Sequence, residues 1–272
     1  MTALYILLGL IGAAALLFLV YALALVFPGV KKARIPKFSH LFTDYAHRGM
    51  WGDGVPENSL AAFARAADRG FGMELDVRLS KDGKVFVFHD NDLFRMTGKK
   101  GKFWEFTSKE IEGLRLNGTG EKIPYFTEVL DLVSGRVPMM VELKGENFDT
   151  AVCVETDRIL SGYKGDYCVE SFNPVLVGWY RKNRPEVMRG QLVDGRKKLL
   201  SALCSSLVFN IYNRPDFISY KYDRYNRLAL CLATRLWGAK RVVWTVKSEQ
   251  TRQNAINDGT AVIFEGFVPE RD

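Results

Sequence analysis

Short apolar, strand-like runs alternate with helical runs along most of this chain, and the alternation restricts its fold more than any other feature. Alternation of this kind predicts a parallel sheet whose strands are joined by crossover helices. Helices are expected over 60–69, 125–133, 150–160, 174–182, 225–237 and 249–258. Strands are expected up to His47 and over 71–79, 85–89, 137–143, 167–172, 187–192, 206–211 or 217–220, 241–246 and 261–264.

A strand count near eight favours closure of the sheet into a TIM (β/α)8 barrel, which commonly needs about 250 residues. The chain has 272 residues, so one barrel and a short extra segment fit. An open doubly wound sheet is the alternative, but no G-x-G-x-x-G motif follows the first strand. A polar, glycine-rich stretch at about 90–121 predicts a small insertion after the third strand.

The amino-terminal segment is expected to cross a membrane. Residues Ala3 to Phe27 carry no charge, and about 20 apolar residues suffice for a spanning helix. A cleaved signal peptide is the alternative, but it would have a positive leading region and a shorter apolar core of about 7–15 residues. We predict a transmembrane helix over 1–29, a basic juxtamembrane linker over 30–41 and the barrel over 42–272.

Four cations follow the apolar segment closely, at Lys31, Lys32, Arg34 and Lys37. The positive-inside rule predicts that this side faces the cytoplasm. The chain is therefore expected to be a single-pass membrane protein with a cytoplasmic barrel. The same cations suit anionic lipid headgroups.

The net charge of +7 favours anionic partners such as phosphorylated substrates. Nucleic acid is not expected to be a partner, because the chain lacks a basic helix and an aromatic stacking platform. The four cysteines contain no C-x-x-C pair, so we interpret them as buried thiols or incidental residues.

Two of the three histidines, His47 and His89, stand at the ends of expected strands. The carboxyl ends of barrel strands face the active site, so both are candidate catalytic residues. A buried structural histidine is the alternative for either one alone. Their occurrence at two matching strand ends favours a functional site.

Carboxylates occupy similar positions. Glu74 and Asp76 lie two residues apart on an expected strand and therefore project from the same face. Glu142 lies near the end of another strand, and two residues later Lys144 shares its face. Three carboxylates at strand ends predict a site for a divalent cation, Mg²⁺ or Ca²⁺ rather than zinc. Lys144 and Arg48 can supply positive charge to a phosphate.

Several motifs occur along the chain in a fixed order. The early ones are His47-Arg48-Gly49, Pro56-Glu57-Asn58-Ser59, Glu74-x-Asp76, Ser80-x-Asp82-Gly83, His89-Asp90 and Thr97-Gly98. The later ones are Ile123-Pro124, Glu142-Leu143-Lys144, Ser171-Phe172 and Trp244-Thr245-Val246. Through these motifs the sequence from about His47 to Gly259 resembles the glycerophosphodiester phosphodiesterase family, whose members have a TIM barrel with a small insertion.

The resemblance implies a role for each matching residue. It implies that Glu74, Asp76 and Glu142 are metal ligands and that His47 and His89 form the general acid and base pair. Residues placed near the phosphate or the substrate are Arg48, Glu57, Lys144, Phe172 and Trp244. Core packing is the alternative for the two aromatic residues.

One departure from the family pattern concerns the last short strand. Family members often have an aspartate there, whereas this chain has Glu265 after Phe264. The expected activity is metal-dependent hydrolysis of glycerophosphodiesters to sn-glycerol 3-phosphate and an alcohol. The alternatives are a lysophospholipase D acting on membrane lysophospholipids and a non-catalytic, membrane-tethered binding module.

Overall fold

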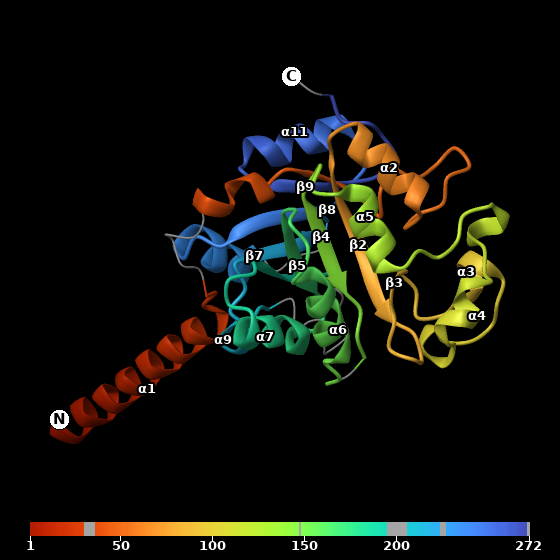
Figure 1. Ribbon diagram of the computed structural model, residues 1–272. Helices are drawn as coiled ribbons and strands as arrows, with labels where there is room; N and C mark the ends of the chain where they lie inside the picture. Colours follow the sequence, from red (N-terminus) through yellow and green to blue (C-terminus); the bar gives the residue numbers. More distant parts are fainter. Residues whose placement is uncertain (30–35, 147, 195–205, 224–226, 271–272) are drawn as a thin grey trace.

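The computed structural model describes the chain except residues 30–35, 147, 195–205, 224–226 and 271–272. Within that part, eight parallel strands close into a barrel, because β1 pairs with both β2 and β9. The barrel strands are β1 (Asp44–His47), β2 (Gly72–Leu79), β4 (Met139–Leu143), β5 (Tyr167–Ser171), β6 (Arg189–Val193), β7 (Phe217–Lys221), β8 (Lys240–Val246) and β9 (Ala261–Phe264). The TIM barrel predicted from the sequence is confirmed (Figure 1).

Helices surround the barrel. The longer ones are α2 (Leu60–Asp68), α5 (Phe126–Val133), α6 (Ala151–Leu160), α7 (Pro174–Asn183) and α11 (Glu249–Asn257). Shorter ones are η1 (Pro36–Leu41), α9 (Asn210–Asn213) and α10 (Arg227–Cys231), which continues as the π-helical segment η4 (Leu232–Leu236). Of the two ranges proposed for one strand, 217–220 is correct, and 206–211 is wrong because a turn and the start of α9 lie there.

The expectation that 85–89 forms a strand of the barrel is wrong. The strand here is β3 (Val85–Val87), which ends before Phe88, runs antiparallel to β2 and lies outside the ring. Only a tight turn separates the two strands, with the Ser80 amide donating to the Lys84 carbonyl at 2.9 Å. A parallel connection needs about a dozen residues or more, so this short link permits only an antiparallel hairpin.

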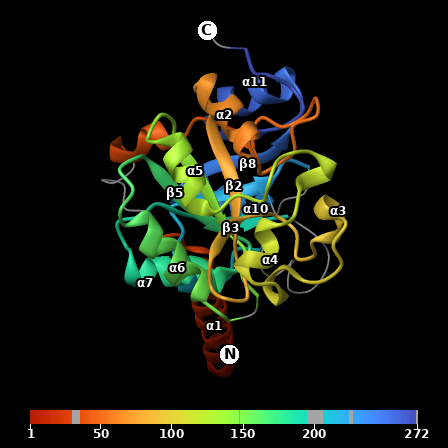
Figure 2. The ribbon, with the colours of Figure 1, turned by 45° about the vertical axis from the view of Figure 1, so that its right-hand side comes forward.

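The residues after β3 build a small subdomain on one side of the barrel. It contains α3 (Phe94–Thr97), η2 (Phe103–Glu105), α4 (Ser108–Glu112) and η3 (Leu116–Gly118). Figure 2 shows α3 and α4 side by side at this position. Eight buried apolar residues give it a core of its own, namely Phe86, Phe88, Leu93, Met96, Phe103, Ile111, Leu116 and Ile123.

The barrel has apolar layers inside and outside the sheet. On β2, Met73, Leu75 and Val77 belong to the core between the sheet and the helices. Inside the barrel, a second core packs Tyr45, Met140, Cys168, Phe217 and Val242 together with other apolar residues. Because side chains alternate along a strand, Glu74 and Asp76 point inward, away from the helix-facing residues.

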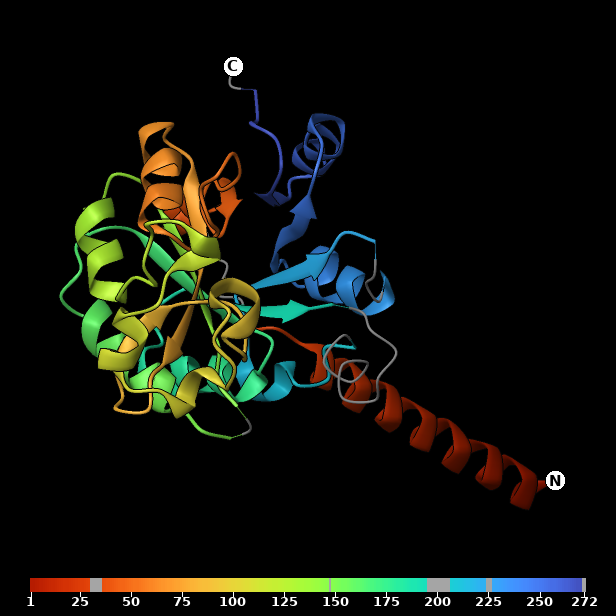
Figure 3. The same cartoon turned by 90° about the vertical axis from the view of Figure 1, so that its right-hand side faces the viewer.

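The amino-terminal segment forms α1 (Thr2–Val26), a helix of 25 residues. At about 1.5 Å per residue it measures roughly 37 Å, more than the ~30 Å of a bilayer core. It is long and apolar enough to cross a membrane, and Figure 3 shows it projecting away from the barrel. Residues 30–35 of the linker predicted over 30–41 lie outside the described residues, and the rest of it forms η1.

Candidate active site

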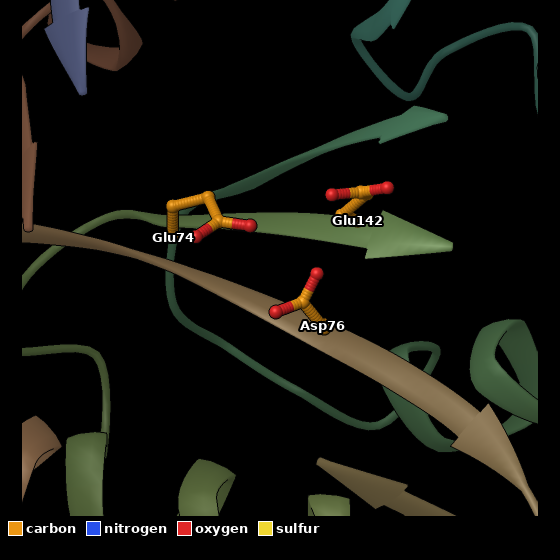
Figure 4. A group of neighbouring side chains, drawn as sticks. All are labelled: Glu74, Asp76 and Glu142. Atoms are coloured by element: carbon orange, nitrogen blue, oxygen red, sulfur yellow. The ribbon is translucent and has the colours of Figure 1, made fainter. Parts of the chain in front are cut away.

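Three carboxylates from two neighbouring strands converge inside the barrel. Glu74 and Asp76 come from β2 and Glu142 from β4, with Asp76 and Glu142 opposite each other in the strand register. One oxygen of each lies within 4.8 Å of the others, and all three residues are buried (Figure 4). The sequence prediction that these acids share one face therefore agrees with their arrangement.

Burial and the neighbouring charges shift the pKa values of the three carboxyl groups in this cluster. Burial, together with the charges of Asp76 and Glu142, raises the pKa of Glu74 well above its usual value. Burial also raises the pKa of Glu142 to about 7. Burial acts to raise the pKa of Asp76 as well, but the positive charges of Lys144 and Arg48 help to hold it well below its ordinary value.

Lysine and arginine side chains partly neutralise the acids. The Lys144 ammonium lies 3.0 Å from Asp76 Oδ1 and 2.6 Å from Glu142 Oε1. The Arg48 guanidinium lies 3.5 Å from Asp76 Oδ2, and its backbone amide donates to Glu74 Oε2 at 3.0 Å. The remaining negative charge and the all-oxygen donor set fit a hard divalent cation.

Asn58 completes the surroundings of Asp76, donating from Nδ2 to Asp76 Oδ2 at 2.8 Å. Its backbone φ of +55° lies in the left-handed region, which asparagine tolerates better than most residues. The next residue, Ser59, caps α2 by accepting from the Ala62 amide at 3.2 Å.

His47 lies at the carboxyl end of β1, as predicted, and its ring is held from both sides. Nδ1 lies 2.5 Å from Glu265 Oε2, and Nε2 lies 4.0 Å from Glu74 Oε2. Burial lowers the pKa of His47, whereas the hydrogen bond to Glu265 acts to raise it. An ionised Glu265 therefore orients the ring so that Nε2 faces the acid cluster.

The Glu265 carboxylate follows β9 directly and also lies 3.1 Å from the Lys247 ammonium. The hydrogen bond from His47 lowers its pKa to about 2, so it stays ionised at neutral pH. Glu265 thus takes the position at which the sequence comparison expected an aspartate. Its position directly after the last strand was the available signal.

The other candidate histidine, His89, follows the antiparallel β3 rather than a barrel strand. Its expected position at a barrel strand end was therefore wrong. Its Nδ1 lies 2.7 Å from Asp90 Oδ1, and the Arg78 side chain donates to its carbonyl at 3.0 and 2.8 Å. Arg78 extends the alternation of Glu74 and Asp76 on β2, so period-two spacing was the signal that could have found it.

A chain of ion pairs connects the two histidine regions. Arg95, from α3, binds Asp90 and Glu57 with shortest distances of 2.5 Å to each. Glu57 in turn binds the Arg48 guanidinium at 2.8 Å. Nothing in the sequence singled out Arg95, because its partners, Glu57 and Asp90, lie on two other segments of the chain.

The two predicted aromatic residues lie together at the edge of the site. Their rings meet edge-on with centroids 5.6 Å apart. Phe172 lines a cavity of about 290 Å³ together with His89, Glu142 and Lys144, and the Lys144 ammonium lies 5.8 Å from its ring centroid. Trp244 is half-buried at this contact.

The sequence is similar to those of known glycerophosphodiester phosphodiesterases. The model of the glycerophosphoryl diester phosphodiesterase family matches residues 47–263. The YhdW protein of Bacillus subtilis is 28% identical over 215 residues, which cover 76% of this chain and 86% of that protein. The glycerophosphodiester phosphodiesterase of Bacillus altitudinis is 39% identical over 110 residues, 38% of this chain and 44% of that relative.

Solved structures resemble the barrel closely. The glycerophosphodiester phosphodiesterase of Thermotoga maritima has 28% sequence identity and a TM-score of 0.65, over 82% of this chain and 93% of its own. A phosphodiesterase of Oleispira antarctica, solved with the product sn-glycerol-3-phosphate, has 23% identity and a TM-score of 0.69, over 82% and 92%. The chain belongs to the glycerophosphoryl diester phosphodiesterase family, and it is a phosphodiester hydrolase.

Proposed function

We propose that the chain hydrolyses glycerophosphodiesters to sn-glycerol 3-phosphate and an alcohol with the help of a divalent cation, Mg²⁺ or Ca²⁺. The convergence of Glu74, Asp76 and Glu142 within 4.8 Å is the observation that carries this proposal. When bound, such a cation would draw charge from a non-bridging phosphate oxygen. The crystallised Oleispira antarctica relative contains sn-glycerol-3-phosphate as its product, which supports the choice of substrate class.

Different side chains of the site bind the phosphate and transfer protons. Lys144 and Arg48 supply positive charge to the phosphate, and Phe172 covers the cavity beside it. One of His47 and His89 accepts a proton from the attacking hydroxyl, and the other protonates the leaving alkoxide. Glu265 and Asp90 orient these two rings through their Nδ1 atoms.

Lysophospholipids are a second substrate candidate because α1 is long and apolar enough to place the barrel beside a bilayer. We propose that α1 is an uncleaved single-pass anchor and that the barrel faces the cytoplasm, on the side of the basic residues after the helix. A lysophospholipase D activity would then release the headgroup alcohol from lysophospholipids in the cytoplasmic leaflet of that membrane. The catalytic groups would be those used for glycerophosphodiesters.

A screen of metals against substrates tests the proposed function. We expect full-length protein to turn over glycerophosphocholine with Mg²⁺ or Ca²⁺, and we expect a chelator to remove most of that activity until metal is restored. Faster turnover of lysophosphatidylcholine would identify the second substrate. Undiminished activity after chelation would contradict the metal requirement, and no turnover of either substrate would indicate a non-catalytic module.

Glu265 is expected to act as a positioning residue. In Glu265→Gln we expect kcat to fall about 100-fold or more with little change in KM, because the His47 ring loses an anionic partner. Since Glu265 acts to raise the pKa of His47, its neutralisation should move the pH-rate limb of His47 to lower pH. The measurement is kcat and KM across pH for both proteins.

Two further variants distinguish a role of Glu265 in orienting the His47 ring from a role in stabilising the fold alone. Glu186→Gln neutralises a surface carboxylate that pairs with Arg184 and should leave the pH profile unchanged. Glu265→Asp keeps the charge and should recover part of kcat. An unshifted pH profile in Glu265→Gln, at equal thermal stability, would rule out the orienting role.

A further inference from the structure

The end of α1 is fixed to the flank of the barrel by side chains of α9 and the residue after it. Asn210 Nδ2 donates to the Val26 carbonyl at 2.8 Å, and Arg214 Nη1 donates to the Phe27 carbonyl at 2.7 Å. Carbonyls at the carboxyl end of a helix have no partner within the helix, so these bonds complete it. The Arg214 guanidinium also lies 4.9 Å from the centroid of the Phe27 ring.

A second helical segment of the barrel touches the same point. The ring of Phe27 meets Trp237 edge-on, with centroids 5.3 Å apart. Trp237 is the residue directly after η4, and Phe27 is the residue directly after α1. The helix formed by α10 and η4 therefore ends at the point where the apolar helix ends. Figures 1 and 3 show the helix formed by α10 and η4 on the same side of the barrel as the base of α1.

This segment exposes an apolar stripe. Leu228 is 72% exposed and Leu236 is 60% exposed, with exposed Cys231 and half-buried Leu232 between them. Leu228, Cys231, Leu232 and Leu236 follow one another at intervals of three, one and four residues. These intervals place all four side chains on one side of the helix. The opposite side is buried in the barrel core through Ala229, Leu230 and Ala233.

The helix α9 adds a second exposed apolar surface. Its side chains Ile211 and Tyr212 are also exposed, although α9 itself holds the base of α1. Both surfaces belong to segments that contact the residues at the end of α1, and exposed apolar surface at such a point marks an interaction site rather than a solvated helix face. Exposed Arg235 on η4 adds positive charge to the same segment.

We propose that the surface formed by Leu228, Cys231, Leu236, Ile211 and Tyr212 lies in the headgroup layer of a membrane and docks the barrel on it. The occupant is a lipid surface because the segments that carry these side chains contact Val26 and Phe27, where the apolar helix ends. Phe27 and Trp237 stand where that helix leaves the hydrocarbon, a position typical of interfacial aromatic residues. Arg214 and Arg235 match anionic headgroups.

This docking rests on the proposed membrane anchoring of α1 and goes beyond it. An amphipathic helix in the interface buries its apolar side ~5–10 Å into the headgroup and acyl boundary. The barrel is then held by two contacts, the spanning helix and the patch. The resulting orientation relative to the bilayer is fixed, independent of the basic linker.

Site-directed fluorescence in vesicles tests the proposal. Full-length protein in which Cys204 and Cys231 are replaced by serine is labelled at Leu228→Cys or Leu236→Cys and reconstituted with phosphatidylcholine and phosphatidylglycerol. Val268→Cys, near the carboxyl terminus and 54% exposed, is the matched water-facing control. Leu16→Cys reports on the apolar helix itself, and iodide and nitroxide-labelled lipids serve as quenchers.

We expect iodide quenching at 228 and 236 to fall to about one fifth of its value at 268, with strong quenching by lipids carrying a shallow nitroxide. Iodide quenching equal to that at 268, while the label at 16 is quenched by deep nitroxides, would overturn the docking and leave the anchor intact. Protection from both quenchers would mean that protein covers the patch, and would overturn it too. A label at 16 that iodide reaches would instead overturn the anchor on which the docking rests. Hydrolysis of a soluble substrate, measured in the same samples, reports on the catalytic proposal separately.

Discussion

Replacement of either His47 or His89 by alanine should lower kcat by about 10²- to 10⁴-fold while the protein stays folded. This is the range by which a positioned general acid or base accelerates proton transfer. Each ring projects from the end of a short segment and is held through Nδ1 by one carboxylate, at 2.5 Å for His47 and 2.7 Å for His89. Steady-state kinetics on a glycerophosphodiester, with thermal unfolding of each variant, measures the effect.

The third histidine provides the matched control. His40 Nε2 lies 3.2 Å from Asp166 Oδ1, and the two side chains are 47% and 64% exposed. Replacement of His40 by alanine should therefore leave kcat unchanged. Rates of wild-type size in His47→Ala or His89→Ala would exclude that residue from the proton transfers.

The second large effect is expected from Asp76→Asn. Asp76 is the most heavily supported of the three acids, with Lys144 at 3.0 Å, Arg48 at 3.5 Å and Asn58 at 2.8 Å. The substitution keeps the size of the side chain and removes its charge. The cation site therefore loses an anionic ligand, and Lys144 and Arg48 lose the carboxylate that both of them contact. We expect activity at saturating metal to fall at least about 100-fold.

Asp68→Asn is the control for this substitution. Asp68 lies at the end of α2, where its exposed carboxylate pairs with Arg136 at 2.8 Å. It should retain full activity and the same metal dependence. An Asp76→Asn protein that is as active as Asp68→Asn would show that the charge of Asp76 is dispensable.

Period-two alternation explains why much of the site could be predicted from the sequence. On β2, the buried Leu75 between Glu74 and Asp76 places the two acids on the opposite face, inside the barrel. The strand β4 repeats the pattern with Glu142 between Val141 and Leu143. Local alternation thus predicted that Glu74 and Asp76 share one face of β2, and closure of the sheet turned that face inward and placed Glu142 beside them.

The features that were missed depend on contacts between distant segments. His89 reaches the site from an antiparallel hairpin, because the turn after β2 is too short for a parallel crossover. Glu265 lies 218 residues after His47, and only closure of β9 onto β1 makes them neighbours. Arg95 comes from an irregular subdomain whose sequence has no periodicity that would indicate the direction of a side chain.

The central claim is that Glu74, Asp76 and Glu142 together hold a divalent cation. Calorimetric titration of Mn²⁺, an oxygen-preferring substitute for Mg²⁺, into wild-type protein and Asp76→Asn tests it most directly. We expect one bound ion per chain in the wild type, displaced by Mg²⁺ or Ca²⁺, and no bound ion in Asp76→Asn. Equal binding by both proteins, or no binding by either, would contradict it.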